Sequence, residues 1–280
     1  MQISASLLSV YDALDEEDIQ SGFGLGCNGV ITVLIEPSTL PTLNARLGHY
    51  ENFLHTQQPT TVATIYSAEG VLKSQIGKTL CLTQAQDPIS NIEHHDLAQA
   101  LCREAQEALA QRYTTCKQYS VAHGAAEVLI ETLLPPIHLV VFGAGYDAVP
   151  LVKMAKELSW RVSIIDYRTS CLSRERFASA DRLVLAKAND LATLTLEREC
   201  TAAVLLSHNF EYDLAVLAKL LPLQLPYLGI LGPKRRAEKL LAELQKRQHD
   251  HSYLLENLYA PVGLDIGAEL PEEIALAIFS

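Results

Sequence analysis

A glycine-rich turn is the part of the sequence whose spacing most clearly predicts chemistry. Residues Gly143–Ala148 form a G-x-G-x-x-A pattern between an apolar run and a helical one. In such a turn the first glycine permits a tight bend and the second lets a pyrophosphate approach the backbone, while free N–H groups at the helix start bind the anion. Gly143 and Gly145 are therefore predicted binding residues. The alternative is a Rossmann turn kept only for packing, without a bound dinucleotide.

Polar residues also follow the neighbouring apolar runs. Asp166 lies about 20 residues beyond the glycine turn, where a carboxylate accepts hydrogen bonds from ribose hydroxyls, and Arg168 could accommodate a phosphate on that ribose. We interpret His208 as a ligand contact, because no nucleophile pairs with it to indicate catalysis. The alternative for His208 is a polar residue that merely ends a strand. We assign no catalytic residue.

A local cluster of cations begins a later helical pattern. Lys234, Arg235 and Arg236 fall in its first turn, where the helix dipole disfavours positive charge. A bound phosphate would reverse that preference, so Lys234 and Arg235 are predicted to contact an anion. The alternative is a basic face that water solvates.

A second glycine-rich segment, Gly22–Gly29, precedes a β-branched run. It is not a P-loop, since no Gly-Lys-Ser/Thr sequence and no helix follow it. Its glycines could bring backbone close to a ligand, and the thiol of Cys27 could react there if it ionises. Gly26, Cys27, Asn28 and Gly29 are therefore candidate binding residues, although a buried structural cysteine explains Cys27 equally well.

The overall composition argues against some classes of binding partner. The 280 residues carry a formal charge of −11, so no broad basic field exists to recruit nucleic acid or an anionic membrane. No apolar run is long enough to span a bilayer. The six cysteines form no C-x-x-C pair and no secretory segment is recognised, so we expect reduced thiols in the cytoplasm.

The elements that must position these residues fall into two groups around Pro135-Pro136, which interrupts both helix and central strand. Residues 1–134 predict a smaller α+β domain. Its expected elements are a buried strand at 30–35, strands at 61–66, 71–76 and 79–82 with a hairpin turn at Glu69-Gly70, and an amphipathic helix at 95–116.

Residues 135–280 predict an α/β domain with a Rossmann-like parallel sheet, because strands and helices alternate. Strands are expected at 138–142, 162–165, 183–185, 202–206 and 227–231, with helices at 148–158, 213–221 and 233–246. A last helix is expected to begin at Pro271, which suits the first helical position. The apolar segment 260–268 is expected to fold back on the protein.

Taken in order, the motifs resemble the XdhC/CoxI family of accessory proteins for molybdenum hydroxylases, along nearly the whole chain. The resemblance rests on residues 24–29 and the strand ending at Glu36-Pro37, on 142–148, 166–168 and 207–209 with Asp213, and on 227–232, 261–268 and 271–275. Many family members carry an upstream segment with Ser-x-x-Arg-x-x-Gly-Ala-like and Ser-Gly-Gly-Cys-Leu-Glu-like motifs. This sequence begins beyond both, so we expect its N-terminal domain to be incomplete.

The resemblance implies a maturation chaperone rather than an enzyme. Such a protein binds molybdenum cofactor (molybdopterin), protects it while a sulfido ligand is installed, and delivers it to a hydroxylase such as xanthine dehydrogenase. A cysteine desulfurase is a second implied partner, and a homodimer stays open. Gly143, Gly145 and the 234–236 cluster would suit the phosphate or dinucleotide of the cofactor. Cys27 would lie near the sulfur-rich end of the cofactor, at the metal.

Two other functions compete with the chaperone interpretation. An NAD(P)-dependent oxidoreductase would explain Gly143, Gly145 and Asp166 equally well, but it needs an acid or base that only His208 offers. A purely structural partner of a hydroxylase would bind neither cofactor.

Overall fold

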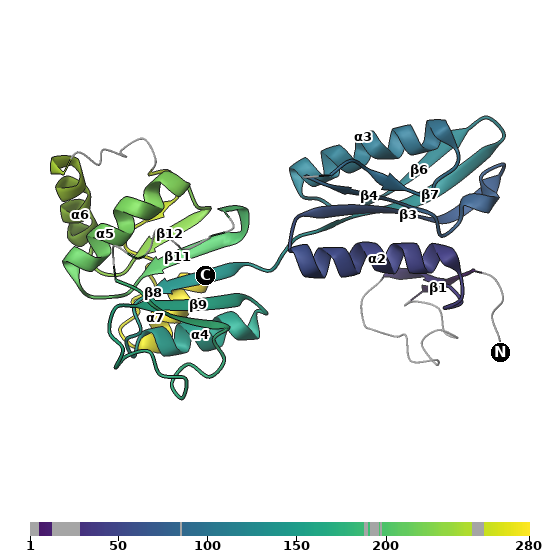
Figure 1. Ribbon diagram of the computed structural model, residues 1–280. Coiled ribbons are helices and arrows are strands. Elements are labelled where there is room, and N and C mark those ends of the chain that lie inside the picture. The colour runs from purple at the N-terminus through teal and green to yellow at the C-terminus, as the bar shows by residue number, and fades with distance from the viewer. Residues whose placement is uncertain are drawn as a thin grey trace. The chain divides into compact units, whose positions relative to one another are not determined.

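The structure is a computed structural model that describes residues 6–12, 29–84, 86–187, 190, 196, 198–247 and 255–280. The chain divides into two compact units, Met1–Pro135 and Pro136–Ser280 (Figure 1). Within the described part, no helix has the length and apolarity that crossing a membrane requires.

The C-terminal unit is built on a parallel sheet, as the alternating pattern predicted, but the described sheet has six strands and the sequence predicted five, missing the two-residue strand β13 (Leu258–Tyr259). Its other strands are β8 (His138–Phe142), β9 (Arg161–Asp166), β10 (Arg182–Leu185), β11 (Thr201–Leu205) and β12 (Tyr227–Ile230). The spatial order is β10-β9-β8-β11-β12-β13, with every pairing parallel. Counted along the chain this is the Rossmann order 3-2-1-4-5-6. The predicted Rossmann-like sheet is therefore confirmed.

Helices cover both faces of this sheet, which explains its nearly continuous apolar strands. The helices α4 (Ala148–Glu157) and α7 (Pro271–Phe279) lie on one face, and α5 (Phe210–Leu220) and α6 (Lys234–Lys246) on the other. The predicted start of α7 at Pro271 is confirmed. Helix α5 begins earlier than predicted, because the side chain of Asn209 caps it by accepting from the N–H of Tyr212.

The segment after β13 packs back on the sheet, as predicted. Val262 is buried, and its N–H donates to the carbonyl of Ile230. The N–H of Leu264 donates to the carbonyl of Ala277 in α7. These bonds fix the C-terminal helix against the strands.

The N-terminal unit holds a five-stranded antiparallel sheet of order β5-β4-β3-β7-β6. The strands are β3 (Thr60–Gly70), β4 (Thr79–Thr83), β5 (Ile89–Ser90), β6 (Thr115–Val121) and β7 (Gly124–Leu133). Helix α3 (His95–Gln111) packs its apolar residues on one face, and α2 (Pro41–Thr56) runs along the other (Figure 1). A separate two-stranded sheet pairs β1 (Leu7–Asp12) with β2 (Val30–Ile35).

Three expectations for this unit were wrong in part. Residues 71–76 are not a strand, because β3 continues to Gly70 and a turn with the 3-10 helix η2 (Lys73–Gln75) follows. Helix α3 ends at Gln111, where Arg112 adopts a left-handed conformation, so Cys116 belongs to β6. The strand at 30–35 exists, but most of its side chains are exposed, since it pairs with one neighbour only.

Candidate functional site

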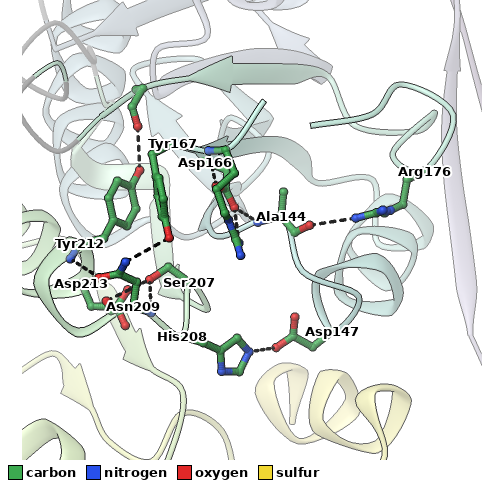
Figure 2. A network of polar contacts seen from close by, with 12 residues as sticks. Ala144, Asp147, Asp166, Tyr167, Arg176, Ser207, His208, Asn209, Tyr212 and Asp213 are labelled. Atoms are coloured by element: carbon green, nitrogen blue, oxygen red, sulfur yellow. Dashed lines mark hydrogen bonds and ion pairs between the residues drawn. The ribbon is translucent and has the colours of Figure 1, made fainter. Parts of the chain in front are cut away.

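The predicted ligand residues that lie together at the topological switch point of the C-terminal sheet are Gly143, Gly145, Asp166, Arg168 and His208. Strands β8 and β11 are neighbours at its centre, and the connections that leave them run to opposite faces. In open α/β sheets ligands bind outside the carboxyl ends of the strands at this point. The loop Gly143–Asp147 follows β8, and the loop Ser207–Asn209 follows β11 (Figure 2).

The two glycines of the first loop have different roles. Gly143 has a φ of 125°, and a Cβ atom built on it would lie 2.5 Å from the carbonyl oxygen of Leu206. Gly143 is therefore required by close packing of two backbones. A Cβ on Gly145 would meet only the side chain of Asp147, whose Oδ1 atom would lie 2.5 Å away. Gly145 thus leaves room that a side-chain carboxylate now occupies.

Backbone donors surround Gly145. Among the described residues, the N–H groups of Gly145, Tyr146 and Asp147 have no hydrogen-bond acceptor. They lie at the start of α4, where four N–H groups of any helix lack an internal partner and the dipole favours negative charge. These donors can bind a phosphate oxygen.

Asp166 lies behind this loop and is completely buried. Its Oδ2 accepts from the N–H of Ala144 at 2.7 Å and from Nη2 of Arg168 at 2.8 Å. Its Oδ1 accepts from the N–H and Nε of Arg168, at 2.8 and 3.0 Å. A carboxylate offers about four acceptor positions. A ribose hydroxyl could therefore bind Asp166 only by displacing one of these donors, and in this structure Asp166 holds the glycine turn and Arg168 together.

The hydrogen bonds also set the ionisation of Asp166. Burial by itself would raise the pKa of this carboxyl, but the bonds from Arg168 and from the N–H of Ala144 outweigh it and hold the pKa below its ordinary value. The group is therefore a carboxylate that neutralises Arg168, whose side chain remains 35% exposed.

A second arginine supports the turn from the other side. The Nη1 of Arg176 donates to the carbonyl of Ala144 at 3.2 Å, and its guanidinium lies 4.6 Å from the ring centre of Tyr146. Sequence reasoning missed Arg176, because it lies in an irregular segment and no motif marks it. Tyr146 is 78% exposed, so this stacked pair borders the site.

His208 joins the two loops. Its Nε2 lies 2.7 Å from Oδ2 of Asp147, and the imidazole is 65% exposed (Figure 2). The residue adopts a left-handed backbone with a φ of 58°, a conformation that costs a residue with a Cβ about 1–3 kcal/mol. A strained residue at a ligand edge is typical of a functional position.

The three predicted cations at the start of α6 differ in their contacts: Arg236 is paired with a carboxylate, whereas, among the described residues, Lys234 and Arg235 are not. The Nη2 of Arg236 donates to Oδ2 of buried Asp213 at 2.7 Å, and Oγ of Ser207 donates to the other oxygen of that carboxylate. Arg236 is thus neutralised and ties α6 to α5. Lys234 and Arg235 are exposed, and neither forms an ion pair with any described residue.

Of the four candidate residues of the N-terminal loop, only Gly29 lies in the described part of the chain. Gly26, Cys27 and Asn28 lie outside the described residues. Gly29 directly precedes β2, and a Cβ built on it would touch nothing within 4 Å. No group of three or more His, Cys, Asp or Glu side chains in the described ranges could hold a metal ion.

Comparison with known proteins identifies the family. The XdhC Rossmann domain matches residues 139–280. A probable xanthine dehydrogenase subunit from Bacillus subtilis (strain 168) is 28% identical over 280 residues, which cover 99% of this chain and 75% of that protein. The uncharacterised protein YqeB of Escherichia coli (strain K12) is 29% identical over 157 residues, 56% of this chain and 29% of that protein.

A solved structure shares the fold. The crystal structure of a xanthine dehydrogenase from Bacillus halodurans superposes with a TM-score of 0.72 at 24% identity, covering 98% of this chain and 73% of that chain. Because the XdhC Rossmann domain matches more than half of the sequence, the chain belongs to the XdhC family.

Proposed function

We propose that this protein binds molybdenum cofactor at the switch point of its C-terminal unit and delivers it to a xanthine dehydrogenase-type hydroxylase. The observation that carries the proposal is the glycine turn at α4, whose N–H groups lack acceptors among the described residues, in a chain of the XdhC family. The recipient class comes from the names of the similar proteins.

The residues fit the phosphate of such a cofactor. Gly145 gives a phosphate access to the backbone donors, and Lys234 and Arg235 supply uncompensated positive charge at the same edge of the sheet. The carboxylate of Asp147 lies over Gly145 and repels an anion. Phosphate binding therefore requires Asp147 to rotate away, which releases His208 to donate to the ligand.

Bound molybdenum cofactor supplies the metal centre that the recipient hydroxylase uses. The residues of this chain then bind and shield it rather than transform it. Arg168 and Arg176 hold the turn in place through Asp166 and the carbonyl of Ala144. A cysteine desulfurase is proposed as a second partner, because installing a sulfido ligand needs a sulfur donor.

The test is to purify the protein from cells that make molybdenum cofactor, denature it, and assay the supernatant for oxidised pterin fluorescence and nicotinamide dinucleotide in one chromatogram. We expect stoichiometric pterin. Gly145→Leu should abolish it, whereas Gly48→Leu should not, because a Cβ on Gly48 meets nothing within 4 Å. Dinucleotide without pterin would overturn the proposal in favour of an NAD(P)-dependent oxidoreductase.

Delivery is tested separately with an apo-hydroxylase. Protein loaded with cofactor should activate the apo-enzyme in the presence of a scavenger that destroys free cofactor. Direct delivery would be excluded if loaded protein and free cofactor activate the apo-enzyme equally without the scavenger, and if neither activates it when the scavenger is present.

A further inference from the structure

The two faces of the N-terminal sheet are covered in different ways. Helix α3 buries an apolar stripe against one face: Leu97, Leu101, Ala105, Ala108 and Leu109. Helix α2 on the other face buries no residue fully. The half-buried side chains of α2 include Arg46 and Tyr50, spaced one helical turn apart. This face of the sheet is therefore not closed by an apolar core.

A cavity of about 450 Å³ lies between α2, the inner face of β1–β2 and the sheet. Thr64, Leu129 and Cys116 are register partners across β3, β7 and β6, so they form one row along its floor. Val30 and Leu34 contribute apolar wall from β2. Small-molecule sites are typically about 300–1,000 Å³, mostly apolar, with a few converging polar groups. The cavity has all three properties.

Arg46 supplies a fixed hydrogen-bond donor to the cavity. Its Nη2 is bound to the carboxylate of Glu36, whose side chain is 2% exposed and does not line the cavity. Among the described residues, the remaining N–H groups of Arg46 have no acceptor. A buried carboxylate thus orients the guanidinium and leaves donors available to a ligand.

Tyr50 is held in the same way by a second carboxylate. Its hydroxyl donates to Oε2 of Glu131 at 2.8 Å. Burial, and then the bond to Glu131, raise the pKa of Tyr50, so the phenol stays neutral. Its oxygen can still accept a hydrogen bond from a ligand.

The charges determine which ligand fits. One guanidinium is offset by two carboxylates, Glu36 and Glu131, so the site has no surplus positive charge to bind a phosphate or carboxylate. The apolar walls favour a ring surface, and Arg46 favours a carbonyl acceptor on its edge. We propose that this cavity is a second ligand site, which binds a neutral fused-ring heterocycle bearing carbonyl groups.

Lumazine, a fluorescent dioxopteridine, is a suitable probe under slightly acidic conditions, where it is neutral. We expect saturable binding to the full chain. Cys116→Trp should fill the cavity and abolish binding without lowering the melting temperature, because Cys116 is exposed on a strand. Arg46→Gln should weaken binding about tenfold through loss of a charged hydrogen bond. The matched control Glu51→Gln changes an exposed charge on the same helix and should bind normally.

A second readout does not depend on the folding of any variant. Cys116 lines the cavity, so lumazine should slow its alkylation by N-ethylmaleimide, measured by mass spectrometry of the peptide that contains it. Unchanged alkylation at saturating lumazine would overturn the site, and tighter binding of lumazine-6-carboxylate would overturn the charge argument. Gly145→Leu should bind lumazine normally, so this test is independent of the proposed cofactor site.

Discussion

Asp147 is the residue at which the switch point departs most from a simple anion site. Its Oδ2 contacts His208 across the two loops, while its Oδ1 lies over Gly145. A carboxylate at the start of a helix stabilises the free protein through the dipole, and for the same reason it competes with a bound phosphate. We therefore expect Asp147 to stabilise the free site and to lower its affinity for phosphate.

Replacing Asp147 with Asn should tighten phosphate binding severalfold, since about 1 kcal/mol of charge repulsion is removed. The measurement is titration with a phosphorylated compound, such as molybdopterin released from a hydroxylase, at two salt concentrations. The gain should shrink at high salt because exposed charges are screened. Weaker binding by the variant would show that the Asp147–His208 pair holds the ligand instead of excluding it.

Asp166 should control stability at this site in a pH-dependent way. Because its folded pKa lies below its ordinary value, the carboxylate stabilises the protein above about pH 4, and that stability is lost as the pH falls through the folded pKa. Asp166→Asn should lower the free energy of unfolding by about 2 kcal/mol at neutral pH, since Arg168 loses its partner.

Urea denaturation at several pH values measures this effect, with the exposed Asp265→Asn as a matched control. The difference between wild type and Asp166→Asn should disappear in acid. A difference that persists at low pH would mean that packing, not charge, is what the substitution removes.

At the scale of elements, the connection from β8 to α4 depends on two glycines for different reasons. Gly143 is fixed by its positive φ and by the backbone of Leu206, which cannot move without disturbing β11. Gly145 faces only a side chain that can rotate. One glycine therefore serves the fold and the other serves the site.

Gly143→Ala should lower the free energy of unfolding by about 2 kcal/mol or more, because an L residue is strained at that φ and its Cβ would clash with backbone. Gly145→Ala should change it by about 0.5 kcal/mol at most. Chemical denaturation of both variants makes the comparison, and each serves as the control of the other. Equal losses would contradict the assignment of separate roles.

At the scale of the whole molecule, each unit has its own apolar core. The C-terminal unit holds two buried clusters, one on each face of its sheet, and the N-terminal unit holds one beneath α3. Units that bury their own cores can fold independently.

The fragment 136–280 should therefore unfold cooperatively on heating when it is expressed alone. The full chain should then show more than one transition, because two-state behaviour is expected of single domains. Calorimetry of both proteins measures this. A fragment that lacks a cooperative transition and binds hydrophobic dyes would show that its core needs the rest of the chain.

The sequence by itself determined the fold class of the C-terminal unit and the order along the chain of its main strands and helices, but it missed the short strand β13. Glycine spacing and apolar alternation are local signals, and here they agree with the tertiary structure. The same signals marked Gly143, Gly145, Asp166 and His208 at one edge of the sheet. In the N-terminal unit, α2 gave no such signal, because its inner side chains face a cavity rather than an apolar core.

Only the tertiary structure decided which polar groups contact one another. It paired Asp166 with Arg168, Asp213 with Arg236, and Asp147 with His208. The last two pairs join separate elements across the sheet edge, so no spacing along the chain predicts them. Charge compensation depends on distance in space, and for that reason the structure left Lys234 and Arg235 as the predicted cations that remain available to a ligand.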